Sequence, residues 1–188
     1  MTLAGSVSKL ESKFQVLKKT EFRGETTLVI PLEAIHEAAQ FCKDELGFNY
    51  LIDLSGVDNF GEEPRFEVVY ELCILETNTH LRLKCSVSED ALVVPTVSDL
   101  WATADWHERE AYDMLGIQFS GHPNLTRILM WEGYPYHPLR KDFPLAGKES
   151  SVPDVAFTHP IPLAGGPFVT APSCGGSEDR EPRAKPVG

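Results

Sequence analysis

The chain has 188 residues, with 17 Lys and Arg against 28 Asp and Glu and a net charge of -11. This length predicts one domain with room for a tail, and a hydrophobic content of 42% is enough to form a core. The acidic balance argues against nucleic acid as a partner and against adsorption to anionic lipid, because both require clustered positive charge.

Export and membrane insertion are not expected. No run approaches about 18 uncharged apolar residues, the length that a bilayer-spanning helix requires. Lys9, Glu11 and Lys13 stand where a signal peptide would have an apolar stretch. We therefore expect the protein to stay in the cytoplasm, unless it is imported by other means. The four cysteines form no C-x-x-C pair, and Cys42, Cys73 and Cys85 lie in apolar segments, which favours buried free thiols.

Hydrophobic periodicity indicates helices and strands in alternation. In chain order, we predict a helix over 3–17, a strand over 26–30, a helix over 32–46, and strands over 48–54, 66–75 and 80–87. Gly47 lies at the expected C-cap of the second helix, and residues 55–61 are rich in loop formers. The short polar segment 76–79 predicts a hairpin.

In the C-terminal half, Pro95 interrupts the regular secondary structure. After it, residues 97–115 predict two short helices that meet near Thr103. The element order favours an α+β fold, a two-layer structure in which a mixed sheet has helices packed on one face and an extended segment follows. We expect this domain to cover 1–120.

Residues beyond 120 have a different character. A motif segment over 121–148 contains X-Pro steps that hold residues 134–145 extended. The segment 149–188 is rich in proline and glycine, a composition that does not form a compact core. We expect this tail to be disordered or wrapped on a partner.

The helical segment ADWHEREAYDMLGI, residues 104–117, carries the strongest local signals. Asp105 and Glu108 have the spacing of a capping box for a helix that starts at Trp106, and Gly116 is expected to end that helix.

Arg109 lies in the middle of this helix, with Asp105 and Asp113 four residues to either side. In one interpretation the helix is solvated, and these ion pairs contribute only about 0.2–0.5 kcal/mol each. In the other it is a docking helix, because Trp106 and Arg109 are of the residue types enriched at interface hot spots.

Metal binding finds little support in the sequence. His107 begins an H-E-x-x-H pattern, but Ala111 stands where the second histidine would be. His122 and His137 have no Cys or carboxylate at ligand spacing. We expect no catalytic, cofactor-binding or metal-binding residue in this chain.

Four blocks in order, ADWHEREAYDMLGI, GHP at 121–123, RIL at 127–129 and HPLRKDFPL at 137–145, resemble the C-type subunit of NADH-quinone oxidoreductase, respiratory complex I. VPTVSDLW at 94–101 extends the resemblance upstream. The chain departs from the family at Thr126 and Tyr136 and lacks the acidic stretch V-E-x-R-Y-D that longer relatives have after the last block.

The resemblance implies a subunit of the hydrophilic arm, on the cytoplasmic face of the bacterial inner membrane. Its partners would be the quinone-site (D-type) and terminal-cluster (B-type and I-type) subunits. The complex uses FMN, iron–sulfur clusters, NADH and quinone and translocates protons, whereas this chain would bind none of these cofactors. The motif residues that the resemblance places at subunit interfaces are Asp105, Trp106, Glu108, Arg109, Glu110, Asp113, Gly116, His122, Pro123, Arg127, His137, Pro138, Arg140, Lys141, Asp142 and Pro144.

Two other functions stay open. The same type of subunit occurs in membrane-bound hydrogenases and in complexes fed by ferredoxin, and a single subunit does not separate these from an NADH-fed complex. A stand-alone hydrolase would use His107 and nearby carboxylates, but no nucleophile stands beside a base in the sequence.

Overall fold

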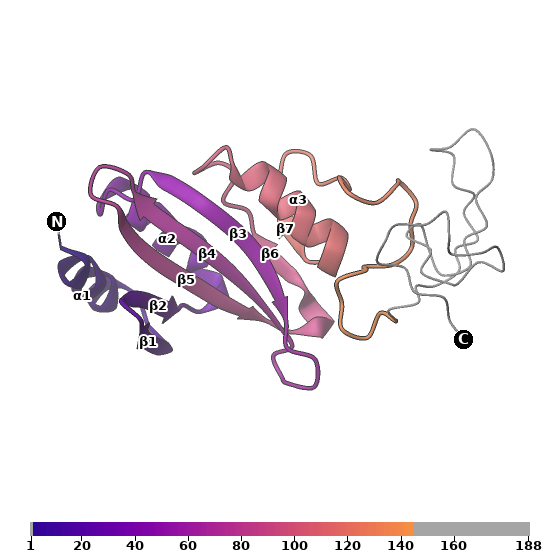
Figure 1. Cartoon of the computed structure of the whole chain (residues 1–188), viewed down its shortest axis with the longest axis horizontal. Coiled ribbons are helices and arrows are strands. Elements are labelled where there is room, and N and C mark those ends of the chain that lie inside the picture. The colour runs from indigo at the N-terminus through magenta and orange to yellow at the C-terminus, as the bar shows by residue number, and fades with distance from the viewer. Residues whose placement is uncertain (1, 145–188) are drawn as a thin grey trace, which may run out of the picture. The chain divides into compact units, whose positions relative to one another are not determined.

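A computed structural model of the chain describes residues 2–144 (Figure 1). The chain divides into two units, Met1–Met130 and Trp131–Gly188. The tail predicted over 149–188 lies outside the described residues. Within residues 2–144, none of the helices combines the length and the apolar character needed to cross a bilayer.

The first unit contains all the helices and strands of the described residues. They are α1 (Leu3–Lys13), β1 (Lys18–Phe22), β2 (Glu25–Val29), η1 (Leu32–Ala34), α2 (Ile35–Asp44), β3 (Tyr50–Asp58), β4 (Phe66–Ile74), β5 (Thr79–Val87), η2 (Glu89–Ala91), β6 (Val93–Pro95), α3 (Ala104–Leu115) and β7 (Gln118–Ser120).

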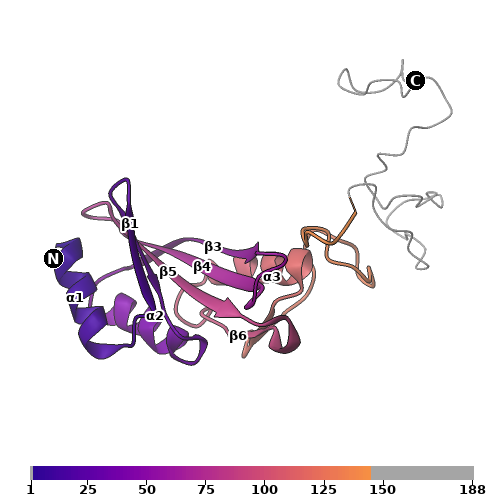
Figure 2. The ribbon, with the colours of Figure 1, turned by 90° about the horizontal axis from the view of Figure 1, so that it is seen from below.

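One mixed sheet organises the unit, with strand order β1-β2-β5-β4-β3. β2 and β5 pair in parallel and the other neighbours are antiparallel. The helices lie on one side of this sheet (Figures 1 and 2). The predicted α+β class, the second helix and the hairpin between β4 and β5 are confirmed. Gly47 has the predicted left-handed conformation just beyond α2, with φ of 82°.

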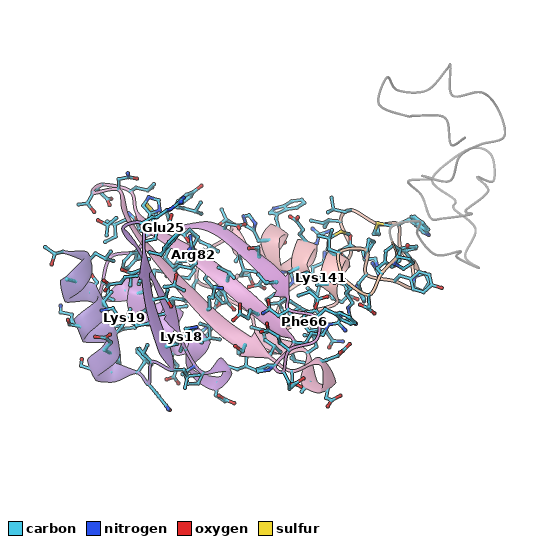
Figure 3. All side chains as sticks on the ribbon, turned by 60° about the horizontal axis from the view of Figure 1, so that its bottom comes forward. Lys18, Lys19, Glu25, Phe66, Arg82 and Lys141 are labelled. Atoms are coloured by element: carbon cyan, nitrogen blue, oxygen red, sulfur yellow. The ribbon has the colours of Figure 1, made fainter. Side chains whose placement is uncertain are left out.

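The core lies between the sheet and the helices because side chains on each strand alternate between the two faces. Along β5, Leu81, Leu83 and Cys85 are fully buried, whereas Arg82 and Lys84 point to the other face. On that face charged side chains pair across strands, and Arg82 Nη2 lies 2.9 Å from Glu25 Oε2 (Figure 3).

The cysteines in the described residues, Cys42, Cys73 and Cys85, are buried free thiols, as predicted. Burial raises the pKa of Cys42 and of Cys85 to about 12. A thiol held protonated in this way behaves as a small apolar side chain rather than as a nucleophile. Cys174 lies outside the described residues.

Two predictions about the strands are wrong. β1 was missed because all five of its residues are exposed, so its sequence has no apolar alternation. The expected loop over 55–61 begins late, because β3 continues to Asp58. Gly56 stands inside β3 for a packing reason: a Cβ atom there would lie 2.4 Å from Leu115 Cδ1 and 2.9 Å from Ile117 Cδ1. Glycine here allows the side chains of Leu115 and Ile117 to pack against the strand, and it does not form a turn.

The region 97–115 contains one helix instead of two. Residues 98–103 form turns, and α3 begins at Ala104. The Thr103 hydroxyl donates to the carbonyl of Leu51, 3.4 Å away, instead of capping the helix. Pro95 lies in β6, a short strand that pairs in parallel with β7. Its missing N–H is tolerated because β6 and β7 form a sheet of only two strands.

Candidate functional site

α3 connects the parallel strands β6 and β7 and packs against β3. Gly116 ends it in the left-handed conformation, with φ of 81°, and its N–H bonds to the Tyr112 carbonyl, as the sequence predicted. The helix buries one face, which includes Ala111 and Leu115, and exposes Trp106 and Glu110. Its buried face also contains two carboxylates, and each of these fixes a different part of the neighbouring chain.

The first carboxylate, Glu108, is fully buried. It accepts a hydrogen bond from Thr96 Oγ1 at 2.5 Å and another from the backbone N–H of Val97 at 2.7 Å. Glu108 therefore holds the turn that follows β6, and the predicted capping box with Asp105 is wrong. Desolvation raises the pKa of Glu108 to about 7, the two hydrogen bonds lower it in part, and the negative charges of Asp105 and Asp99 raise it further.

His122 approaches the same helix from the loop after β7. Its Nδ1 accepts the backbone N–H of Asn124 at 3.0 Å, so the ring proton is on Nε2, which donates to the Asp105 carbonyl at 3.2 Å. His122 Nε2 lies 3.9 Å from Glu108 Oε2, and both side chains are fully buried. Two segments far apart in sequence, around Thr96 and around His122, are thereby fixed on one helix.

The second carboxylate, Asp113, binds the segment that follows His122. Its Oδ2 accepts three successive backbone N–H groups, those of Ile128, Leu129 and Met130, at 3.0, 2.7 and 2.8 Å. Its Oδ1 accepts from Arg127 Nη1 at 2.6 Å. Asp113 is fully buried. Because it binds main-chain groups, it fixes the path of this segment beside α3.

Arg109 does not form the predicted ion pairs with Asp105 and Asp113. Its guanidinium donates to the carbonyls of Thr126 and Arg127, at 3.1 and 3.3 Å, and lies 5.0 Å from the centre of the Trp106 ring. The pairing prediction was wrong because spacing along a helix does not reveal a competing acceptor on another segment. The consequence is a cation–π pair at the surface, with the Trp106 side chain 64% exposed.

Both the metal-site and the hydrolase alternatives would depend on His107. Its Nδ1 lies 3.2 Å from Asp53 Oδ1 at the edge strand β3. Within residues 2–144 no three His, Cys, Asp or Glu side chains are grouped as metal ligands. The Glu108 and Asp113 carboxylates are occupied by hydrogen bonds that hold the chain. This arrangement fixes neighbouring chain segments on α3 and so gives the helix an ordered surface.

The remaining motif residues lie in the second unit, of which residues 131–144 are described. Trp131 and Tyr134 have ring centres 4.5 Å apart, and the rings of Tyr136 and Phe143 are 6.1 Å apart. The expected extended path holds only in part, because residues 138–143 form turns. The Arg140 N–H bonds to the His137 carbonyl, which places Pro138 at the second position of a β-turn, where proline is favoured.

Sequence reasoning selected most of the side chains that fix this region but missed their partners. The structure brings Glu108 and His122 together, and likewise Asp113 and Arg127. Thr96 was not selected, and its only signal was the upstream block VPTVSDLW. The backbone N–H groups of 128–130 were missed as well, because they leave no mark in a sequence.

Comparison with known proteins identifies the family of the chain. The family of the respiratory-chain NADH dehydrogenase 30 Kd subunit matches residues 28–149. The NADH-quinone oxidoreductase C-type subunit of Geotalea uraniireducens is 44% identical over 146 residues, covering 77% of this chain and 89% of that protein. The corresponding subunit of Roseiflexus sp. is 48% identical over 145 residues, covering 76% of this chain and 80% of the relative.

Two solved structures share the fold. A trypsin-resistant fragment of Nqo5 has a TM-score of 0.60 and 33% identity, covering 66% of this chain and all of the fragment. A chain of the membrane-bound sulfane sulfur reductase, an archaeal respiratory membrane complex, has a TM-score of 0.66. At 24% identity, covering 76% of this chain and 85% of that chain, it supports the fold alone. The family match, the relatives and the ordered motif blocks agree, and the chain belongs to the family of the NADH-quinone oxidoreductase C-type subunit, the 30 Kd subunit of respiratory-chain NADH dehydrogenase.

Proposed function

We propose that this chain is a non-redox subunit of the peripheral arm of complex I, and that the exposed face of α3 with the segment 126–130 is its docking surface. The whole complex would transfer electrons from NADH through FMN and iron–sulfur clusters to quinone and couple this to proton translocation. The chain itself would supply no catalytic centre and would be peripheral to the membrane, on the cytoplasmic face. The observation that carries the proposal is the exposed, pre-ordered Trp106–Arg109 pair.

Exposure and order are combined at this surface. Trp106 is 64% exposed and Leu129 is 59% exposed. Tryptophan and arginine are the residue types enriched at binding hot spots. Arg109 stacks near the Trp106 ring while its donors are occupied by the carbonyls of Thr126 and Arg127. The aromatic surface is therefore held in place before a partner arrives, which lowers the entropy cost of binding.

The buried carboxylates support the same interpretation. Asp113 holds the backbone of Leu129 in place although that side chain points to solvent. A buried charge is expensive to maintain unless it is fully hydrogen-bonded, so a carboxylate used only to fix a surface segment suggests that the path of that segment matters. The partners that the family membership favours are the quinone-site subunit and the terminal-cluster subunits of the arm.

The test compares two exposed cation–π pairs on one chain. Trp106→Ala removes the aromatic partner of Arg109, and Phe22→Ala is the matched control, because Phe22 is 65% exposed and has the Arg23 guanidinium 5.1 Å from its ring centre. If α3 is the docking surface, Trp106→Ala weakens incorporation by roughly 30-fold or more, the size of a hot-spot loss, and Phe22→Ala does not.

The measurements are thermal melting of each purified full chain and the amount of chain recovered with native complex from membranes. Equal incorporation of both variants, with unchanged melting temperatures, would refute the assignment of α3 as the docking surface. A similar loss for both would indicate that exposed aromatic residues in general, rather than this helix, support assembly.

A second candidate keeps the type of subunit but differs in the electron donor. A chain of a respiratory membrane complex of another name has the same fold, so the fold alone does not distinguish the two candidates. The decisive observation is the set of proteins that co-purify with the chain. A flavin-bearing NADH-oxidising module supports complex I, and a hydrogenase or ferredoxin-linked module supports the alternative.

A further inference from the structure

A pocket of about 380 Å³ opens between α1 and α2, on elements that the α3 surface does not use. Its walls combine two aromatic rings with carboxylates. The residues that line it are Lys13, Phe14, Glu37, Gln40, Phe41, Asp44 and Glu45. The rings of Phe14 and Phe41 meet edge to face, with centres 5.8 Å apart and an angle of 61° between their planes. Aromatic faces beside negative charge form an environment that favours an organic cation.

The chain's own ammonium group already lies in this pocket. Lys13 Nζ is 4.1 Å from the centre of the Phe41 ring and 5.6 Å from that of Phe14. Both distances are within the range, below about 6 Å, at which a cation is attracted to an aromatic face. Lys13 is the last residue of α1 and its side chain is exposed, so its ammonium can leave the pocket without disturbing the core.

The carboxylates around the pocket are not neutralised by this lysine. Within residues 2–144, Glu37, Asp44 and Glu45 have no cation within ion-pair distance, and the Lys13 ammonium likewise has no carboxylate so close. The pocket therefore keeps an excess of negative charge while it holds one cation by its aromatic walls. A second, better placed cationic group would gain both interactions.

We propose that this pocket binds a lysine or arginine side chain of a protein partner, and that Lys13 occupies the pocket in the free chain and is displaced on binding. Complementarity of charge identifies the occupant, because a chain of net charge -11 with unpaired carboxylates around two rings selects a basic group. The site goes beyond the proposed α3 docking surface, and either one can fail without the other. Phe41 lies within the family match at 28–149, whereas Lys13 and Phe14 precede it.

The experiment uses the full chain and two soluble probes, Nα-acetyl-lysine amide and Nα-acetyl-arginine amide, which are titrated while the ring resonances of Phe14 and Phe41 are followed by NMR. Lys13→Gln removes the internal competitor and is expected to tighten probe binding by about threefold, since an exposed cation–π contact contributes about 0.5–1 kcal/mol. Phe41→Leu keeps the side chain apolar, removes one aromatic face and is expected to weaken probe binding by about threefold or more. Lys9→Gln, on the same helix but outside the pocket, is the matched control and should bind the probes as the unaltered chain does.

Thermal melts of all variants separate a lost site from a lost fold, and Lys13→Gln is expected to lower the melting temperature only slightly, because it removes one exposed cation–π contact. In the unaltered chain, the ε-methylene protons of Lys13 should resonate upfield of ordinary lysine values, because they lie over the Phe41 ring. The proposal is refuted if Lys13→Gln binds the probes no more tightly than Lys9→Gln. It is equally refuted if Phe41→Leu, with an unchanged melt, binds them as the unaltered chain does.

Discussion

Replacing Glu108 with glutamine is expected to remove a pH dependence from the folding of this chain. Burial raises the pKa of Glu108 from 4.5 to about 7, so the folded state holds the proton more tightly than the unfolded state does. Stability from this group is therefore fully present below about pH 4.5 and is lost as the pH rises through 7. At about 1.36 kcal/mol per pKa unit, the total change is roughly 3 kcal/mol, of which 2–3 kcal/mol falls between pH 5 and pH 8.

Glutamine suits this site because it is uncharged and has nearly the shape of a protonated glutamate. Its carbonyl can accept the Val97 N–H, and its amide can donate to Thr96 Oγ1, whose hydroxyl is 2.8 Å from Ser98 Oγ and can donate there instead. The variant is expected to gain stability relative to the unaltered chain as the pH rises. Near pH 5 the two should differ little, because Glu108 is then protonated in the folded state.

The assay is urea denaturation of the full chain at pH 5, 6, 7 and 8, with the difference in unfolding free energy between variant and unaltered chain plotted against pH. Taking this difference cancels all other titrating groups. Glu110→Gln is the matched control for the loss of one carboxylate, since Glu110 is on the same helix but exposed. A difference for Glu108→Gln that does not change with pH would refute the argument that burial governs this carboxylate.

Two further substitutions test how α3 is held and what it holds. Asp113→Asn places an amide donor against Arg127 or against backbone N–H groups, and is expected to cost about 3 kcal/mol and to speed tryptic cleavage after Arg127; an unchanged cleavage rate would argue against Asp113 as the anchor. Gly56→Ala puts a methyl group 2.4 Å from Leu115 Cδ1 and is expected to cost about 1–3 kcal/mol in urea denaturation. Combined with Leu115→Ala it should cost less than the sum of the two changes, and strict additivity would show that these residues do not compete for space.

The sequence predicted the strands in which buried and exposed residues alternate. It missed a strand that is stabilised by pairing with its neighbour rather than by burial. β5 was located because Leu81, Leu83 and Cys85 alternate with polar residues. β1 has no buried residue and is stabilised by pairing with β2, so periodicity gave no signal for it. Gly56 was assigned to a loop because glycine in isolation favours turns, whereas its reason lies in Leu115, far along the chain.

In the candidate site, the features that neighbouring residues determine were predicted, and the contacts between distant segments were not. The helix that contains Trp106 and its end at Gly116 follow from neighbouring residues, and both were predicted. The partners of Glu108 and Asp113 lie 11 to 17 residues away and are largely backbone groups. Helical spacing favoured Arg109 as the partner of Asp113, but a segment outside the helix brings Arg127 to it instead. Pairing of this kind depends on tertiary structure.

Because Asp113 binds main-chain N–H groups, the path of the backbone at 128–130 is fixed independently of the side chains there. The carboxylate recognises the N–H groups at 128–130 and takes no account of the side chains attached to them. The exposed position at Leu129 can therefore change its side chain while the course of the chain stays fixed, with proline as the exception because it lacks the N–H. Under the docking proposed above, a change in the partner's surface could be matched by substitution at this position alone, without altering the backbone path that Asp113 fixes.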